Sequence, residues 1–414
     1  MLVALLPKQS THQNMKKLNL IPALLLMAIV VFTGCKKDEG DPIVPTPTTP
    51  TGNLIVTQNI TSNTTWSNDR VIQLGGRITV TSGATLTIEK GTVIKGEAGT
   101  GANATALLIA RGGRLIAEGT ATEPIIFTSV ADEITAALVQ AGEFESPNLS
   151  PDINGLWGGV VILGSAPISA SSSGGDISEV QIEGIPTSDA NGLYGGNNSA
   201  DDSGIIKYIS IRHGGTNIGS GNEINGLTLG GVGSGTVIEN VEVVANQDDG
   251  IEFFGGSVNV NNVVIWNSGD DGIDTDQSWS GTLDNFVVIA STGHSLELDG
   301  PEGSMIDGHT IRNGSIIASV DGRVCEDLIN VDNNSVVALE NLYFRDIVDG
   351  QRLNNVTAAG VTFSFIYFDV DPNNLANHVN GAIPAGVTAG GTPQADITLL
   401  AWTWAAQAGA MTGL

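Results

Sequence analysis

Three consecutive stretches of this chain repeat one another: NVEVVANQDDGIEFFGGSVNV (240–260), NVVIWNSGDDGIDTDQSWSGTL (262–283) and NFVVIASTGHSLELDGPEGSMI (285–306). Each opens on an asparagine, at 240, 262 and 285, so the period is 22 and then 23 residues. A self-similar period of this length is the signature of a solenoid, in which each coil packs on its neighbours. The repeat therefore predicts an architecture, but it does not name a reaction.

Polar residues, most of them acidic, recur at fixed places in the repeat. Aligned by the repeat, they fall into two columns, called the acidic columns here. The first contains Asn225, Asp249, Asp271 and His294, and the second contains Glu252, Asp274 and Glu297. Neighbouring parallel strands lie about 4.8 Å apart, so we expect the members of a column to lie directly above one another.

The acidic columns predict a calcium site. The expected ligands are Asp249, Glu252, Asp271, Asp274, Asp276 and Glu297. No Lys or Arg occurs between residues 214 and 311. Carboxylates stacked without a cation repel one another, and Ca²⁺ prefers oxygen ligands of this kind. The alternative is a solvated, hydrogen-bonded ladder of Asp and Asn turns that holds no metal.

Composition favours an all-β protein with an acidic surface. Glycine occurs 54 times, mostly at turn positions, and short alternating strands rich in Val, Ile and Thr follow residue 53. The net charge of −27 makes nucleic acid an unsuitable partner. Residues 131–153, with a short helix, and residues 170–204 interrupt the strand pattern, so we expect loops that wall a binding groove.

The opening coils resemble those of the pectin-lyase-like β-helix superfamily. The resemblance is carried by ATLTIEKGTVI (84–94) and GRLIAEGT (113–120). It implies a right-handed parallel β-helix over residues 53–380. Residues 381–414 are expected to form a C-terminal cap, with Trp402 and Trp404 covering the last coil. The superfamily includes lyases, hydrolases, adhesins and non-enzymes, so the resemblance specifies the fold and leaves the function open.

A second, local resemblance is to polygalacturonase-type glycoside hydrolases. Its motifs correspond to Asn246-Gln247-Asp248, Asp270-Asp271 and Gly293-His294-Ser295. The resemblance implies that Asp270 is the general acid, that Asp248 and Asp271 activate water, and that His294 tunes them. The family's R-I-K motif is missing, since only Ile311-Arg312-Asn313 follows. A lyase is expected less, because the columns contain no Lys or Arg to abstract a proton.

Two aromatic residues are candidates for stacking on a sugar. Trp279 lies in DQSWSG, an expected loop, and Tyr194 lies in the interruption at 170–204. Cys325 is expected to be a buried core residue. The other cysteine, Cys35, is expected to carry a lipid, which leaves no pair for a disulfide.

The N-terminus resembles a bacterial lipoprotein signal. Met15 is the expected start, Leu18–Phe32 is the apolar region, and Cys35 is the lipidated residue. Residues 1–34 are thus expected to be removed, and residues 35–52 to form a Pro/Thr tether. Lys36-Lys37-Asp38-Glu39 resembles the export signal of surface lipoproteins of Bacteroidota. This predicts a lipid-anchored protein exposed on the outer membrane.

These observations favour a cell-surface lipoprotein with a non-catalytic binding or structural role. Calcium and a glycan are its expected ligands. The alternative is a polysaccharide-degrading enzyme, a glycoside hydrolase before a lyase, that uses Asp248, Asp270, Asp271 and His294. The sequence does not predict an oligomeric state.

Overall fold

The computed structural model describes residues 52–218 and 224–414. The described residues form one compact unit. The predicted signal peptide, Cys35 and nearly all of the tether lie outside the described residues. Within the described ranges, no helix is both long and apolar enough to cross a membrane.

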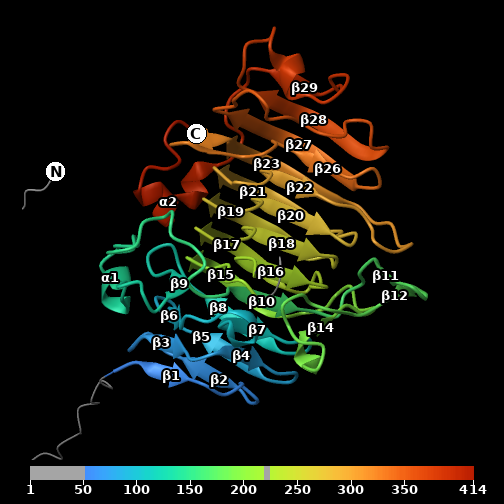
Figure 1. Ribbon diagram of the computed structural model, residues 1–414. Coiled ribbons are helices and arrows are strands. Elements are labelled where there is room, and N and C mark those ends of the chain that lie inside the picture. Colours follow the sequence, from blue (N-terminus) through green and yellow to red (C-terminus); the bar gives the residue numbers. More distant parts are fainter. Residues whose placement is uncertain (1–51, 219–223) are drawn as a thin grey trace, which may run out of the picture. The chain divides into compact units, whose positions relative to one another are not determined.

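The chain coils into stacked parallel strands, which form two large sheets (Figure 1). The prediction of an all-β, right-handed parallel β-helix is confirmed. The larger sheet contains β1 (Leu54–Val56), β2 (Thr64–Trp66), β3 (Ile72–Leu74), β5 (Thr85–Ile88), β6 (Val93–Gly96), β8 (Arg114–Glu118), β9 (Ile125–Ser129), β15 (Gly204–Arg212), β17 (Val237–Val244), β19 (Val260–Trp266), β21 (Thr282–Ile289), β23 (His309–Ile317), β27 (Val336–Arg345), β28 (Gly360–Phe368) and β29 (Val387–Ala389). The smaller sheet contains β4 (Arg77–Val80), β7 (Ala106–Ile109), β10 (Val160–Leu163), β16 (Leu227–Gly230), β18 (Ile251–Phe254), β20 (Ile273–Asp276), β22 (Leu296–Leu298) and β26 (Asn330–Val331).

Short elements lie outside the two sheets. The hairpin strands are β11 (Ala170–Ser172) with β12 (Gly175–Ile177), β13 (Val180–Gln181) with β14 (Leu193–Tyr194), and β24 (Ser319–Val320) with β25 (Arg323–Val324). The helices are α1 (Ala136–Gln140) and α2 (Trp404–Gln407), with 3₁₀ turns η1 (Gly101–Asn103), η2 (Ala190–Gly192), η3 (Leu375–His378) and η4 (Ile397–Leu400). The helix expected within 131–153 is confirmed as α1.

The larger sheet bends, so it supplies two faces of the solenoid. In β15, Ile205–Lys207 pair with β8 and Ile209–Ile211 pair with β9, and Tyr208 between them has φ of 50°. The six long strands above it bend at Asn240, Asn262, Asn285, Asn313, Asn341 and Phe365, all with positive φ. Asparagine tolerates this left-handed conformation better than most residues, which explains the asparagine that opens each repeat.

Apolar residues stack in register inside the solenoid. Val241, Val263 and Phe286 lie one above the other on β17, β19 and β21. Gly314 follows in that stack, and a Cβ there would come within 2.3 Å of the Phe286 ring. The bare glycine therefore makes room for the phenyl ring. All three apolar side chains are fully buried in one continuous core.

The C-terminal segment does not cap the last coil, so that prediction is wrong. Trp404 packs 5.7 Å from Trp266, and Trp402 packs 5.5 Å from Tyr208, between ring centroids. Figure 1 shows α2 beside the middle coils and close to α1. The outer side of β17, β19 and β21 carries apolar residues such as Val264, and the segment buries them. The last strand is β29, so the solenoid continues beyond residue 380.

The outer side of the smaller sheet is apolar on its first strands and acidic on later ones. On the lower strands, β7 and β10, the outward residues include Leu108, Val161 and Leu163. The segment that carries β13 and β14 covers them. On the upper strands, β18 and β20, the outward positions carry Glu252 and Asp274. The candidate site lies on this upper, acidic part.

Candidate functional site

The structure confirms the predicted register of the acidic columns. Strand pairing aligns Thr228, Glu252, Asp274, Glu297 and Asn330 on β16, β18, β20, β22 and β26. These residues alternate with buried apolar ones along each strand, so they point away from the core. The second column is thus an outward-facing stack.

The first column is a ladder of side-chain to backbone hydrogen bonds. Oδ1 of Asp249 accepts the N–H of Asp271 at 2.9 Å, and Oδ1 of Asp271 accepts the N–H of His294. Asp327 repeats the pattern in the next coil by accepting the N–H of Arg352 at 2.9 Å. The expected hydrogen-bonded ladder therefore exists, but each such bond uses one carboxylate oxygen and leaves the other for a different partner.

Asp249, Glu252 and Asp274 form a buried carboxylate group. One oxygen of each lies within 4.8 Å of the others. Asp249 and Glu252 are only 6% and 8% exposed. Burial, followed by the charge of Asp274, raises the pKa of Asp249 well above its usual value. Burial, together with Asp249, does the same to the pKa of Glu252, and burial, together with Glu252, to the pKa of Asp274.

Two buried oxygens at the carboxylate group lack a hydrogen-bond partner among the described residues. Nδ2 of Asn225 donates to Oε2 of Glu252, while Oδ1 of Asn225 and Oδ1 of Asp274 are buried and accept no hydrogen bond from the described residues. Asn225 itself is 2% exposed. Buried oxygens without partners are costly, and carboxylate and amide oxygens are the ligands of calcium. The residues present therefore fit a hard divalent cation.

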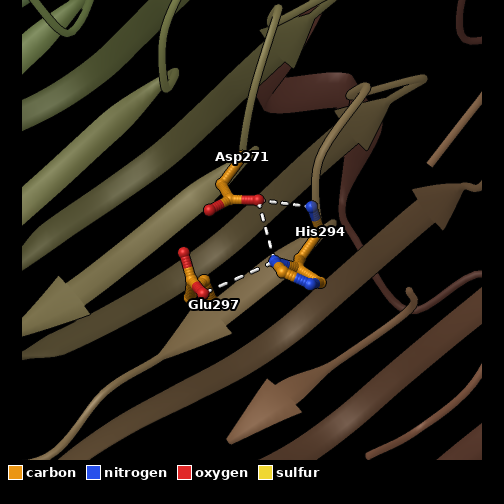
Figure 2. Close-up of side chains that lie close together, drawn as sticks. All are labelled: Asp271, His294 and Glu297. Carbon is orange, nitrogen blue, oxygen red and sulfur yellow. Dashed lines mark hydrogen bonds and ion pairs between the residues drawn. The ribbon is translucent and has the colours of Figure 1, made fainter. Parts of the chain in front are cut away.

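Asp271, His294 and Glu297 form a second group (Figure 2). Nδ1 of His294 lies 3.1 Å from Oδ1 of Asp271 and 3.6 Å from Oε1 of Glu297. Burial acts to lower the pKa of His294, but Asp271 and Glu297 outweigh it and raise it to about 9. The hydrogen bond with Asp271 raises the pKa of Glu297 to about 9. The imidazole thus carries a proton at neutral pH, which disfavours it as a metal ligand.

Asp248 and Asp270 form a third group with Asp249, with carboxylate oxygens within 4.8 Å of one another. Asp270 is exposed and Asp248 is half-buried. Gly293 lies against this group, because a Cβ there would come within 2.3 Å of Oδ1 of Asp270 and 2.4 Å of Oδ1 of Asp271. The four predicted catalytic residues are thus neighbours. Asp271 and His294, however, belong to the group with Glu297 and not to the group with Asp248 and Asp270.

The structure does not bring Asp276 together with the other predicted metal ligands. Its Oδ1 accepts the N–H of Gln277 at 2.6 Å, and among the described residues it belongs to none of the three groups. Burial, with the charges of Glu302 and Asp299, raises its pKa to about 7. It lies further along β20, where the strand ends.

The predicted aromatic platform is also wrong, because both rings are buried. Trp279 is 1% exposed and stacks on Phe253 with ring centroids 3.9 Å apart inside the solenoid. Two successive left-handed residues, Gln277 and Ser278, turn the chain inward there. Tyr194 is 1% exposed, and its hydroxyl donates to Oε1 of Gln277 at 2.9 Å. Neither ring offers a face to a sugar.

Sequence reasoning missed Glu183 at this site. It belongs to the segment that covers the lower strands, and its charge helps to raise the pKa of Glu252, after burial and Asp249. No repeat relates Glu183 to the columns, so no sequence signal marked it. Cys325, in contrast, is buried as expected, and burial raises the pKa of its thiol to about 11.

Comparison with family models gives one match. A model described as a pectate-lyase-like β-helix domain matches residues 58–143 and 144–385. Searches of curated proteins and of solved structures return no match. The stacked parallel strands, the asparagine bends and this match over most of the chain agree, and the chain belongs to the family of pectate-lyase-like β-helix domains.

Proposed function

We propose that this protein is a surface-anchored, non-catalytic β-helix that binds calcium on its acidic outer side and engages a glycan. The observation that carries the proposal is the buried carboxylate group formed by Asp249, Glu252 and Asp274. A family of carbohydrate-related β-helix domains is the setting in which a glycan ligand is expected. The acidic net charge of −27 agrees with a cation as the second ligand.

The negative charge of the buried carboxylate group favours a bound cation such as calcium. Within the described residues, none of the 12 observed ion pairs joins a Lys or Arg to Asp249, Glu252 or Asp274. Buried carboxylates must then take up protons or hold a cation, because leaving them ionised and unpaired is strongly unfavourable. Buried oxygens without partners on Asn225 and Asp274 favour the cation, since an added proton alone satisfies only one of them.

The surface anchor rests on the sequence. The lipoprotein-like signal ending at Cys35, the charged residues 36–39 and the proline-rich tether support a lipid anchor in the outer membrane. The tether would hold the β-helix away from the bilayer surface.

A second candidate function is polysaccharide hydrolysis. The exposed Asp270 beside half-buried Asp248, with the protonated His294 close by, favours it. Inverting glycosidases, however, hold their two carboxyl groups roughly 6.5–9.5 Å apart to admit water. One oxygen of Asp248 and one of Asp270 approach within 4.8 Å of each other, which leaves little room for a water between them, and residues 214–311 contain no Lys or Arg to bind a uronate. Binding is therefore the better supported function.

A calcium titration followed by thermal melting tests the proposal. We expect calcium to raise the melting temperature of the full chain, purified in mild detergent, and to leave an Asp249→Asn/Asp274→Asn variant unchanged. Glu118→Gln/Glu340→Gln removes the same charge elsewhere and serves as the control, which should respond like the wild type. A wild-type melting temperature that ignores calcium would refute the calcium site.

Hydrolysis is tested separately, by measuring reducing ends released from polygalacturonate and from neutral polysaccharides. The proposal expects no release by the wild type. Release that disappears in Asp270→Asn, in a variant that still responds to calcium, would establish the enzyme instead.

A further inference from the structure

The bend between two faces of the solenoid is a ladder of left-handed residues. Five successive coils place asparagine there, at 240, 262, 285, 313 and 341, with φ between 53° and 60°. The side chains bond along the stack, since Asn285 donates to Asn262 at 2.8 Å and Asn341 donates to Asn313 at 3.1 Å. Asparagine therefore satisfies both the backbone conformation and the packing of this bend.

Phe365 departs from this ladder in the next coil. It lies opposite Asn341 between paired neighbours on β27 and β28, and it has φ of 60°. A bulky residue is an outlier in this conformation, which it adopts at a cost in free energy. Its side chain is also 60% exposed, so burial returns little of that cost. Stability alone does not explain a phenylalanine at this bend.

The other end of the ladder shows what a covered aromatic bend looks like. Tyr208, with φ of 50°, is half-buried, and Trp402 from the C-terminal segment packs edge-on against it at 5.5 Å. Among the described residues, no aromatic ring packs in this way against Phe365. The two aromatic bends thus differ in that one has its partner within the chain.

Phe365 borders a shallow groove with a volume of about 480 Å³. The groove is lined by Phe363, Ser364, Phe365, Tyr367, Ala385, Gly386 and Thr388. Tyr367 and Thr388 are neighbours in register on β28 and β29. Gly391 packs against the Tyr367 ring so closely that a Cβ would come within 2.5 Å of it, so the backbone holds this ring in place.

We propose that Phe365 and Tyr367 form a stacking site for a neutral sugar ring of a glycan. The inference gives a place to the glycan binding proposed above and rests on it. The faces of aromatic rings are electron-rich and attract the C–H groups on the apolar side of a sugar. The hydroxyls of Ser364 and Thr388 line the same groove and can hydrogen-bond to sugar hydroxyls.

The lining also selects among ligands. It contains no charged side chain, which favours a neutral sugar over a uronate or a phosphate. Its volume lies in the range of about 300–1,000 Å³ typical of small-ligand sites. A stable protein interface takes roughly 20–30 residues on each side, whereas seven residues line this groove.

The test measures binding and stability in the same variant. Phe365→Asn restores the ladder residue, so we expect its melting temperature to rise by roughly 2 °C. Affinity electrophoresis in gels containing xylan, mannan or β-glucan should show at least a tenfold loss of affinity for the polysaccharide that retards the wild type. Phe365→Tyr keeps a ring and should retain binding. Ile306→Asn, which removes a side chain that is 68% exposed elsewhere, is the control and should bind like the wild type.

The outcomes separate this site from the broader proposal. If no polysaccharide retards the wild type, glycan binding itself is refuted, and this inference with it. If Phe365→Asn binds as well as the wild type, glycan binding stands and this site is wrong. If Phe365→Asn instead abolishes self-association in light scattering and leaves glycan binding intact, the groove joins two copies of the chain and the inference is overturned.

Discussion

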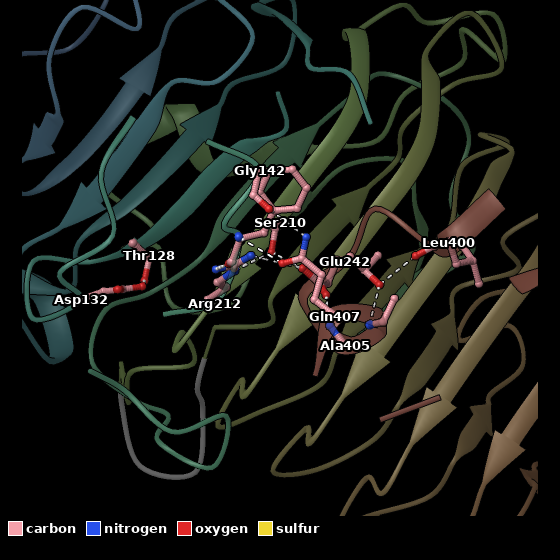
Figure 3. Close-up of polar contacts among 12 residues, drawn as sticks. Thr128, Asp132, Gly142, Ser210, Arg212, Glu242, Leu400, Ala405 and Gln407 are labelled. Atoms are coloured by element: carbon pink, nitrogen blue, oxygen red, sulfur yellow. Dashed lines mark hydrogen bonds and ion pairs between the residues drawn. The ribbon is translucent and has the colours of Figure 1, made fainter. Parts of the chain in front are cut away.

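Two regions of the β-helix bury carboxylates, and they balance the charge differently. On the flank covered by the C-terminal segment, Oε2 of Glu242 accepts the hydroxyl of Ser210 and lies 3.5 Å from Nη2 of Arg212 (Figure 3). Its Oε1 accepts the N–H of Ala405 at 2.9 Å. Arg212 also donates to the carbonyl of Phe144. This cluster around Arg212 and Glu242 is complete within the chain.

Among the described residues, the buried carboxylate group of Asp249, Glu252 and Asp274 has no such cationic partner. Asp249, Glu252 and Asp274 face one another, and burial with like charges raises all three pKa values. Glu242 therefore has a buried counter-ion, Arg212, whereas no Lys or Arg of the described residues pairs with Asp249, Glu252 or Asp274. The first cluster therefore stabilises the fold by itself, whereas the second needs protons or a cation from the solvent.

The largest expected effect comes from breaking the flank pair. Arg212→Met leaves Glu242 buried without its cation, which typically costs about 3–5 kcal/mol. Urea denaturation followed by circular dichroism measures the loss in the free energy of unfolding. Replacing both partners, as Arg212→Met/Glu242→Leu, should recover much of it, since apolar pairs often replace buried ion pairs at little cost. A double variant as unstable as Arg212→Met would show that packing, and not charge, holds this flank.

The acidic outer side should make the stability of the protein depend on pH. Burial raises the pKa of Asp276 to about 7, and burial with Asp332 raises that of Asp299 to about 6. The folded protein then binds more protons than the unfolded chain. The stability that Asp276 and Asp299 contribute is therefore fully present below about pH 4 and is lost as the pH rises to 7, by up to about 1.4 kcal/mol per pH unit for each group.

Melting curves between pH 4 and 8, with calcium and with a chelator, measure this dependence. The raised pKa values of Asp249, Glu252 and Asp274 add to this decline, and calcium should flatten their part of it, because it neutralises these three carboxylates at high pH. A melting temperature that rises from pH 5 to 7 in the chelator would contradict the raised pKa values.

The smallest expected effect is on the rim of the flank cluster. The exposed Gln407 accepts the N–H of Phe144 at 3.1 Å and donates to the carbonyl of Gly142 at 3.1 Å. Gln407→Ala should cost about 1 kcal/mol, since water replaces both bonds. Hydrogen exchange of the Phe144 amide should speed up while the amides of β19 stay protected. Equal acceleration in both would mean that the segment unfolds together with the solenoid.

The repeat made the fold and much of the site predictable. A period of 22 or 23 residues set the coil length, and it aligned Asp249 with Asp271 and Glu252 with Asp274 as the structure does. What the period could not indicate is which neighbours come from outside the repeat. Glu183 belongs to an insertion, and nothing in its own sequence relates it to Glu252.

The β-helix and its acidic columns were predictable from the amino-acid sequence alone, because both follow from local spacing that recurs in every coil. The folded structure alone places Trp279 inside the solenoid and covers Tyr194. It also places the C-terminal segment along the middle coils. These depend on backbone turns and on apolar surfaces that meet across long sequence separations, where burial and not periodicity selects the contact.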